Sequence, residues 1–217
     1  MSKVVIINGT SSAGKTSLSL AVQQHAARRR EAWQHVSLDQ FRDGLPMAWR
    51  GLNAPADTTG AEGLNVVPWQ GTDERQCAIQ GTSIELGAHG RAVMAGMRRS
   101  VAAFADLDLN VIVDDMWCNA EPAQDFAHIL DVENTWVVGL YCSESELARR
   151  EAQRPTRFPG TAIRENKRVH NVTVNCSYDL ELHSDKLSPA VLAEQVFERL
   201  SSPPQMLAGL LARGEPL

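Results

Sequence analysis

The segment Gly9–Thr16 limits the folds open to this chain more than any other part of the sequence. It reads Gly-Thr-Ser-Ser-Ala-Gly-Lys-Thr and matches the whole pattern G-x-x-x-x-G-K-[ST]. An apolar, strand-like stretch at residues 3–7 precedes it, and a helix-like stretch at residues 15–30 follows. A phosphate-binding loop works in this position, between a strand and a helix. The sequence therefore predicts an α/β protein with the P-loop nucleoside triphosphate hydrolase fold.

The residue types of this loop suit the binding of a triphosphate. Glycines let the backbone curl so that successive N–H groups point toward phosphate oxygens, and the helix N-terminus adds partial positive charge. We expect Lys15 to reach the β- and γ-phosphates and the Thr16 hydroxyl to bind Mg²⁺. The expected cofactors are ATP and Mg²⁺, and the expected nucleotide-binding residues are Gly9, Thr10, Ser11, Ser12, Ala13, Gly14, Lys15, Thr16 and Ser17.

Apolar segments alternate with helix-like segments along the rest of the chain. Nearly continuous apolar runs are typical of strands that are buried on both faces of a parallel sheet. Further strands are expected at residues 35–38, 109–113, 136–141 and 178–182, and further helices at about 82–106, at 143–153 and from Pro189 onward. This alternation predicts a doubly wound parallel sheet in a single domain over residues 1–217. Residues 51–73 are rich in Gly, Pro, Ala, Asp and Thr, so we expect a long surface loop or an insertion there.

Two acidic residues follow the strand-like run Val111–Val113. A carboxylate at the carboxyl end of such a strand lies near the metal of a bound nucleotide. We expect Asp114 to serve the metal and Asp115 to be a base or a partner of a lid.

Asp39 follows the second predicted strand, so it should emerge at the edge of the sheet where the phosphates bind. A carboxylate there can accept a proton from an attacking hydroxyl group. Position alone allows a second interpretation, in which Asp39 caps the helix that begins at Gln40.

The segment 149–168 is strongly basic and is interrupted by prolines. It holds seven basic and two acidic residues, in a chain whose net charge is −5. Arginines in a segment that closes over a phosphoryl group stabilise the charge of the transition state. We therefore expect a lid here, and the alternatives are a nucleic-acid patch or plain surface.

Composition and local patterns exclude several functions. The acidic balance argues against a general nucleic-acid binder, and the chain lacks an apolar run long enough to span a membrane. The sequence Asn166–Val169 lacks the acid of the guanine-reading N-K-x-D pattern of regulatory GTPases. We expect a cytoplasmic protein with free thiols, because no leader pattern precedes the first strand and the cysteines are widely spaced, at Cys77, Cys118, Cys142 and Cys176.

Together these motifs resemble the chloramphenicol phosphotransferase-like family of P-loop kinases. The resemblance covers most of the chain in order and rests on Ile7–Thr16, Val36–Asp39, Asp43–Pro46, Val111–Asp115, Arg150–Arg157, Val169–His170 and Tyr178–Leu182. It implies a five-stranded sheet in the nucleoside-kinase-like order 2-3-1-4-5 with an arginine-rich lid. It also implies ATP-dependent transfer of the γ-phosphate to a hydroxyl of a small molecule, as in antibiotic-modifying enzymes that phosphorylate chloramphenicol.

The same resemblance implies roles for single residues. Asp39 would be the base that activates the hydroxyl, and Arg154 and Arg157 would contact phosphates together with Arg150. The candidate lining of the acceptor pocket is Phe41, Met47, Trp49, Trp69, Met97, Asp115 and Trp117, although a methionine at helical spacing is more often part of the core.

The family resemblance does not fix the acceptor. One alternative is a nucleotide-binding regulator, or a toxin-type kinase that acts on a sugar nucleotide or a macromolecule. Another is a nucleoside monophosphate kinase. An oligomer is compatible with all three hypotheses.

Overall fold

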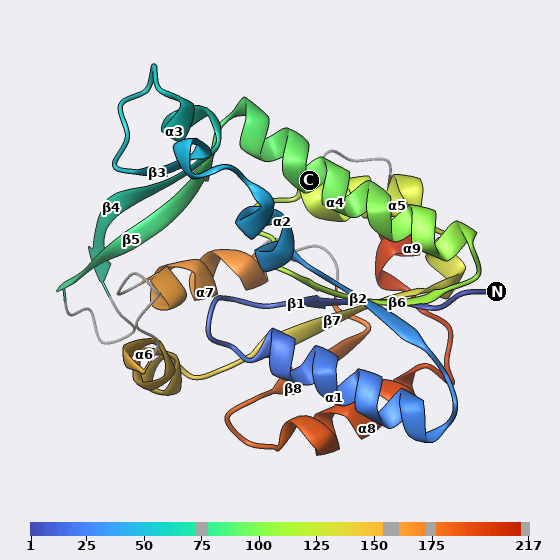
Figure 1. Ribbon diagram of the computed structural model, residues 1–217. Helices are drawn as coiled ribbons and strands as arrows, with labels where there is room; N and C mark the ends of the chain where they lie inside the picture. The colour runs from blue at the N-terminus through green and yellow to red at the C-terminus, as the bar shows by residue number, and fades with distance from the viewer. Residues whose placement is uncertain (73–77, 154–160, 172–176, 214–217) are drawn as a thin grey trace.

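The computed structural model describes residues 1–72, 78–153, 161–171 and 177–213. Two sheets are present: a five-stranded parallel sheet in the order β2-β6-β1-β7-β8 and a smaller sheet in the order β3-β4-β5 (Figure 1). The strands are β1 (Val4–Asn8), β2 (Trp33–Ser37), β3 (Arg50–Leu52), β4 (Leu64–Thr72), β5 (Ala78–Leu86), β6 (Asn110–Asp115), β7 (Thr135–Tyr141) and β8 (Leu180–His183).

Strand β1 is the centre of the large sheet. It pairs in parallel with β6 on one side, where Val4 lies opposite Val111, and with β7 on the other, where Val4 lies opposite Thr135. All residues of β1 are buried, because helices cover both faces of the sheet. Taken in chain order, the strands of this sheet follow the order 2-3-1-4-5, which confirms the topology that the family resemblance implied.

Helices form two layers around the large sheet. Figure 1 shows α1 and α8 against one face and α4, α5 and α9 against the other. Successive residues of β1 serve these layers in turn: Val5 and Ile7 pack with α1 and α8, whereas Val4 and Ile6 pack with α4, α5 and α9. The helices are α1 (Lys15–Arg28), α2 (Leu38–Gly44), α3 (Thr59–Glu62), α4 (Ala88–Asp106), α5 (Glu121–Ile129), α6 (Glu144–Ala152), α7 (Thr161–Asn171), α8 (Pro189–Arg199) and α9 (Met206–Arg213), with 3₁₀ turns η1 (Met47–Trp49) and η2 (Val132–Asn134).

Of the two expectations for residues 51–73, the surface loop is wrong, because the described residues up to Thr72 form helix and strands. This segment contains α3 and most of the small sheet, in which β4 pairs with β5 in antiparallel register from Leu64–Leu86 to Thr72–Ala78. The expected helix at 82–106 is wrong at its start for the same reason, because its first residues belong to β5 and α4 begins only at Ala88. The glycine and proline residues of this segment favour a loop when only local composition is considered. The strands are stabilised by pairing between residues that are distant in the sequence, which local composition does not report.

The small sheet has its own apolar contacts. Leu45, Leu64 and Val66 form a cluster, and side chains from η1, β5 and α4 pack against it. Gly63 is required here because a Cβ at this position would lie 2.1 Å from the carbonyl oxygen of Trp49. The Asn65 side chain holds the preceding loop, since it accepts from the N–H of Ala54 and donates to the Ala54 carbonyl, at 3.0 Å each. The small sheet therefore forms one wall above the carboxyl edge of the large sheet (Figure 1).

Candidate active site

The phosphate loop joins β1 to α1, as the motif predicts. Two of its glycines are required by geometry. A Cβ at Gly9 would lie 2.7 Å from the carbonyl oxygen of Leu140 in the neighbouring strand β7. Gly14, the residue before α1, has a φ of 99°, which L side chains rarely adopt. The loop can pass this close to the sheet and turn into the helix only with glycine at these two positions.

Several polar groups of the loop are arranged for a ligand. The Ser11 and Ser12 hydroxyl groups are buried, with residues 6% and 4% exposed, and neither has a hydrogen-bond partner among the described residues. The first N–H groups of α1 have no carbonyl within the helix to bond. A buried hydroxyl without a partner is costly, so these atoms fit the oxygen atoms of a bound phosphate chain.

A hydroxyl group and a carboxylate that could hold a metal ion lie beside the loop. The Thr16 hydroxyl donates to Oδ2 of Asp114 over 2.7 Å, and His35 Nε2 lies 3.5 Å from the same oxygen. Burial acts to raise the pKa of Asp114, but the contacts with His35 and Thr16 and the charge of Lys15 outweigh it and lower the pKa. Asp114 is therefore an ionised carboxylate, and together with the Thr16 hydroxyl it offers the oxygen ligands that Mg²⁺ prefers.

The contacts of Asp115 differ from those of Asp114. Its carboxylate accepts from the backbone N–H of Met116 at 2.8 Å and from Trp117 Nε1 at 3.0 Å. Full burial raises the pKa of Asp115, although these hydrogen bonds act to lower it. The backbone N–H of Trp117 in turn donates to the side chain of Asn8 at the end of β1. Asp115 thus shapes the loop after β6, and the geometry favours Asp114 as the residue for the metal.

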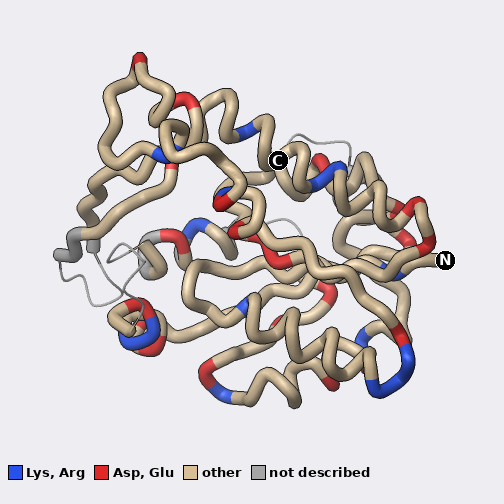
Figure 2. Tube along the Cα trace, in the orientation of Figure 1, with Lys and Arg blue, Asp and Glu red and all other residues tan. Residues whose placement is uncertain are grey.

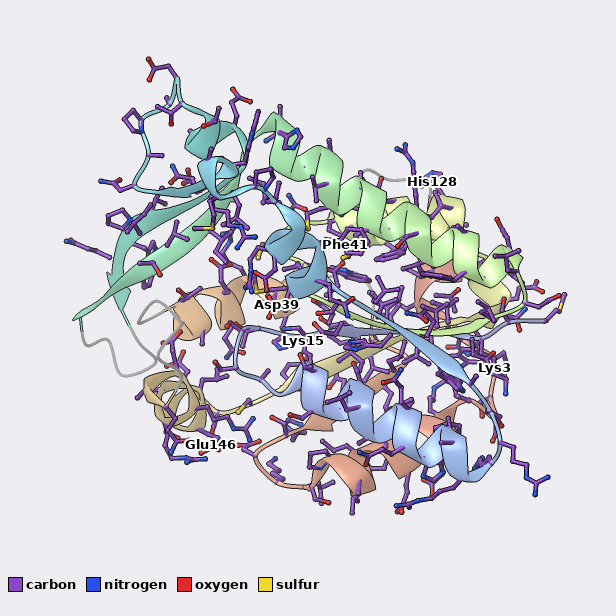
Figure 3. The ribbon with its side chains drawn as sticks, viewed as in Figure 1. Lys3, Lys15, Asp39, Phe41, His128 and Glu146 are labelled. Carbon is purple, nitrogen blue, oxygen red and sulfur yellow. The ribbon has the colours of Figure 1, made fainter. Side chains whose placement is uncertain are left out.

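Asp39 lies in the first turn of α2. The helix is capped by Ser37 and Gln40, which form a reciprocal capping box, so the alternative interpretation of Asp39 as the cap is wrong. The Asp39 carboxylate forms an ion pair with Arg42 at 2.7 Å. Figure 3 shows Asp39 and Lys15 facing each other, and both line a cavity of about 40 Å³ together with Thr16, Arg42 and Asp114. We call it the phosphate cavity.

A larger cavity of about 460 Å³ adjoins this phosphate cavity. Leu38, Ile84 and Met116 line both, so the two spaces meet at the carboxyl edge of the large sheet. The larger cavity lies among α2, the small sheet, α4, the loop after β6 and α7. Its other lining residues are Leu64, Ser83, Glu85, Leu86, Arg91, Met94, Arg98, Cys118, Asn119, Glu121, Pro122 and Arg168. We call it the acceptor cavity.

The residues predicted to line an acceptor pocket lie elsewhere. Met97 and Trp117 are fully buried in the core between α4 and the sheet, and Met47 is 76% exposed. The Trp49 ring is tilted against the His89 ring, with centroids 4.3 Å apart, and Phe41 lines a separate surface cavity beside His89. Trp69 lies in β4 and Asp115 in the loop network, so the structure places none of the predicted residues in the acceptor cavity.

Helix geometry explains this error. Met97 faces the sheet, whereas Met94 and Arg98, on the adjacent face of α4, reach the cavity. Arg91, Met94 and Arg98 are three and four residues apart, a spacing that places them on one face of the helix. That spacing is the signal in the sequence that could have found them. Arg42 and His35 were also missed, although the spacing of Asp39 and Arg42 could have indicated their pair.

The predicted lid is described only at its two ends. Arg150 of α6 donates to the carbonyl oxygens of Ser12 and Ala13 in the phosphate loop, at 3.4 and 3.2 Å, and to Ser184 Oγ at 3.0 Å. Arg154 and Arg157 lie outside the described residues. Their predicted contacts with phosphates stay predictions.

Helix α7, which contains the end of the predicted lid, is fixed to the small sheet by a buried carboxylate. Glu165 accepts from Cys118 Sγ at 3.0 Å, from Arg168 at 3.3 Å and from Ser83 at 3.4 Å. Burial and the nearby Glu165 charge raise the pKa of Cys118 well above its usual range, so the thiol stays protonated and donates. Glu165 thus joins α7, β5 and the loop after β6 in one wall of the acceptor cavity.

Comparisons with known proteins agree with this geometry. The family model described as "Chloramphenicol phosphotransferase-like protein" matches residues 2–201. Two Mycobacterium tuberculosis proteins, from strains CDC 1551 and H37Rv, are named as candidate O-phosphotransferases. Each is 30% identical to this chain over 216 residues, which cover 95% of this chain and 85% of the relative.

Solved structures share the fold at low sequence identity. The APS kinase CysC of Mycobacterium tuberculosis, in complex with AMPPNP and APS, is 17% identical with a TM-score of 0.59, over 93% of this chain and 98% of that one. An unliganded sugar kinase from Janibacter sp. HTCC2649 is 13% identical with a TM-score of 0.60, over 93% and 95% of the two chains. Within the described residues, no helix has the length and apolar character needed to cross a membrane.

Proposed function

Because this chain belongs to the chloramphenicol phosphotransferase-like family and is a phosphotransferase with a P-loop kinase fold, we propose that it transfers the γ-phosphate of ATP to a hydroxyl group of a small molecule. One observation carries this proposal: the phosphate cavity and the acceptor cavity share Leu38, Ile84 and Met116, and Asp39 lines the phosphate side of the junction. A cavity of about 460 Å³ is of the size that small organic ligands occupy.

In this proposal the phosphate loop holds the triphosphate. The loop N–H groups and the Ser11 and Ser12 hydroxyls donate hydrogen bonds to phosphate oxygens, and Lys15 reaches the β- and γ-phosphates. In the structure the Lys15 ammonium group donates to the carbonyl oxygen of Thr10 at 3.0 Å, and this contact holds it beside the loop. Thr16 and Asp114 would hold Mg²⁺, which when bound neutralises phosphate charge. The APS kinase structure, a complex with AMPPNP, is consistent with nucleotide binding on this fold.

The chemical step follows from the position of Asp39. The acceptor oxygen attacks the γ-phosphorus, the bond between that phosphorus and the bridging oxygen breaks, and ADP leaves. The proton of the acceptor hydroxyl passes to the Asp39 carboxylate, which leaves a phosphate monoester as product. Arg42, whose guanidinium group lies 2.7 Å from the Asp39 carboxylate, orients it. We propose that Arg150 and the predicted lid residues Arg154 and Arg157 stabilise the charge on the transferred group.

The proposal is tested by a screen for ADP release in the presence of Mg²⁺ and ATP. The screen covers hydroxyl-bearing antibiotics, beginning with chloramphenicol, then nucleosides, sugars and nucleoside monophosphates. We expect acceptor-stimulated ADP release and a phosphate monoester that can be located by ³¹P NMR and mass spectrometry. Slow hydrolysis of ATP that no acceptor stimulates would instead indicate a nucleotide-binding regulator and would contradict the proposal.

A further inference from the structure

The acceptor cavity combines an apolar wall with arginine side chains. Its apolar wall comes from α2, the small sheet, α4 and the loop after β6, through Leu38, Leu64, Ile84, Leu86, Met94, Met116 and Pro122. Its basic side comes from Arg91 and Arg98 of α4 and Arg168 of α7, and Figure 2 shows basic segments on both helices. An uncharged apolar acceptor would pack against the apolar wall but would form no ion pair with the arginine side chains.

The three arginines differ in how far the protein neutralises them. Arg98 is 4% exposed, and its guanidinium group binds Asp125 at 2.6 Å and lies 3.6 Å from Glu121. These two carboxylates compensate its charge, so Arg98 holds α4 to α5. Arg98 therefore belongs to the frame of the cavity and is not available to a ligand.

Arg91 and Arg168 are available. Arg91 donates to the carbonyl oxygen of Leu86 at 2.6 Å, and no carboxylate of the described residues lies within ion-pair distance of it. The side chain of Arg168 is 42% exposed, and its contacts with Glu165 and with the Cys118 carbonyl are long, at 3.3 and 3.5 Å. A guanidinium group has five N–H donors in a fork, so both residues keep donors for a ligand.

Among the described residues, the carboxylates around the cavity pair with Arg98 and Arg168 and not with Arg91. Glu121 already lies near Arg98, and Glu165 is shared among Ser83, Cys118 and Arg168. Glu85 is the remaining carboxylate among the lining residues, and it is exposed on β5. The lining thus holds two guanidinium groups with spare donors and one exposed carboxylate, beside its apolar wall.

From this arrangement we infer that the acceptor cavity selects an organic anion, a molecule with an apolar body and a carboxylate, sulfate or phosphate group that Arg91 and Arg168 hold. The inference rests on the proposed function, since it concerns the acceptor of that reaction. Forked guanidinium groups suit planar carboxylates and phosphates, and such charge-assisted hydrogen bonds are about twice as strong as neutral ones. An uncharged acceptor such as chloramphenicol would bind less well than an anionic molecule of the same size.

The test measures anion binding with the phosphate loop filled, so that the two sites are not confused. The full chain is saturated with Mg²⁺ and AMPPNP and then titrated by calorimetry with phenylphosphonate or with benzyl alcohol, which has a similar ring but no charge. Arginine side-chain N–H signals in the NMR spectrum identify the residues that contact the probe. The variants are Arg91→Ala, Arg168→Lys and, as the matched control, Arg99→Ala, an exposed residue of α4 outside the cavity lining.

We expect phenylphosphonate to bind at least about tenfold more tightly than benzyl alcohol and to shift the Arg91 and Arg168 signals. Arg91→Ala and Arg168→Lys should each weaken binding about tenfold, whereas Arg99→Ala should leave it unchanged. Lysine at position 168 keeps the charge beside Glu165 but loses the fork, and unchanged melting temperatures will show that the variants are folded.

Equal binding of the two probes, no saturation by phenylphosphonate below about 10 mM, or wild-type affinity in both variants would overturn the inference. Failure of AMPPNP to bind would contradict the proposed function instead. The titration of the nucleotide-free protein would then decide the inference by the same dependence on Arg91 and Arg168.

Discussion

Asp39 is the residue on which the proposed chemistry depends. Replacing it with asparagine keeps the size of the side chain and one acceptor oxygen but removes the carboxylate that takes up the proton. We expect Asp39→Asn to bind nucleotide as wild type does and to lower acceptor-dependent ADP release at least about 100-fold. Calorimetry gives the first quantity and the coupled ADP assay gives the second.

Asp43 supplies the matched control for this variant. It lies one turn further along α2, also forms an ion pair with Arg42, at 2.9 Å, and does not line the phosphate cavity. Asp43→Asn should therefore retain turnover within about threefold of wild type. Turnover of Asp39→Asn equal to that of Asp43→Asn would rule out Asp39 as the base.

The partly buried His170 side chain makes the free energy of unfolding depend on pH. Burial, together with the charges of His183 and Lys15, lowers the pKa of His170 from 6.5 to about 4. Between pH 6.5 and pH 4, His170 is protonated in the unfolded chain but neutral in the folded chain. The free energy of unfolding therefore decreases as the pH falls from 6.5 to 4. Allowing for solvent screening of this half-buried ring, we expect a loss of roughly 1–2 kcal/mol from this group.

The variant His170→Phe isolates this effect. Phenylalanine can keep the stacking of His170 on Tyr141, whose ring centroids are 3.8 Å apart, but it cannot titrate. Thermal unfolding between pH 6.5 and 4 should show a shallower decline for this variant than for wild type. His128→Phe, at an exposed position of α5 labelled in Figure 3, should leave the slope unchanged. Equal slopes for His170→Phe and wild type would contradict the assignment.

Sequence reasoning worked for residues whose role is set by their immediate neighbours. The phosphate loop is a local motif, so the order of residues along the chain is enough to identify Gly9, Gly14, Lys15 and Thr16. The choice between Asp114 and Asp115 is harder, because adjacent strand residues point to opposite faces. Their contacts distinguish them: Asp114 accepts from the distant Thr16, whereas Asp115 accepts from Trp117, two residues along the chain.

Helix α7 depends on one buried carboxylate for its attachment to the small sheet. Replacing Glu165 with alanine removes the acceptor of Ser83, Cys118 and Arg168 at once. Since each buried donor left without its acceptor costs about 1–3 kcal/mol, we expect Glu165→Ala to reduce the free energy of unfolding by about 3 kcal/mol. Urea unfolding followed by circular dichroism measures this change.

An exposed glutamate provides the comparison. Glu194 lies on the solvent side of α8, so Glu194→Ala should alter stability by less than about 0.5 kcal/mol. A Glu165→Ala variant as stable as Glu194→Ala would show that the α7 contacts contribute little and that the wall of the acceptor cavity is held in another way.

The small sheet marks the limit of prediction for whole elements. Long helices and the buried strands of the large sheet follow from local periodicity, and they were predicted with modest errors at their ends. Residues 64–72 and 78–86 form strands because β4 and β5 pair with each other and pack on α4. The apolar residues Ile84 and Leu86 fit the start of a helix equally well, since the apolar spacing of α4 continues beyond them.

Each of the two cavities is formed by several helices and strands together. The phosphate cavity forms where β1, β6 and α1 meet, so the strand order and one motif were enough to predict it. The acceptor cavity needs α2, β4, β5, α4, α5 and α7 at once, from segments that span residues 38–168. No local pattern reports such an assembly, and this is why the aromatic residues that looked suited to an acceptor lie in the core or on the surface instead.

Nucleotide binding by the phosphate loop is the claim on which everything else depends, and calorimetric titration of Mg²⁺ and ATP into wild type, Lys15→Ala and Lys3→Ala tests it most directly. Lys3 precedes β1 at the opposite end of the sheet from Lys15, so its variant is the control (Figure 3). We predict saturable binding to wild type and Lys3→Ala, with affinity at least about tenfold weaker in Lys15→Ala. No binding heat with wild type, or equal affinity in Lys15→Ala, would contradict the account.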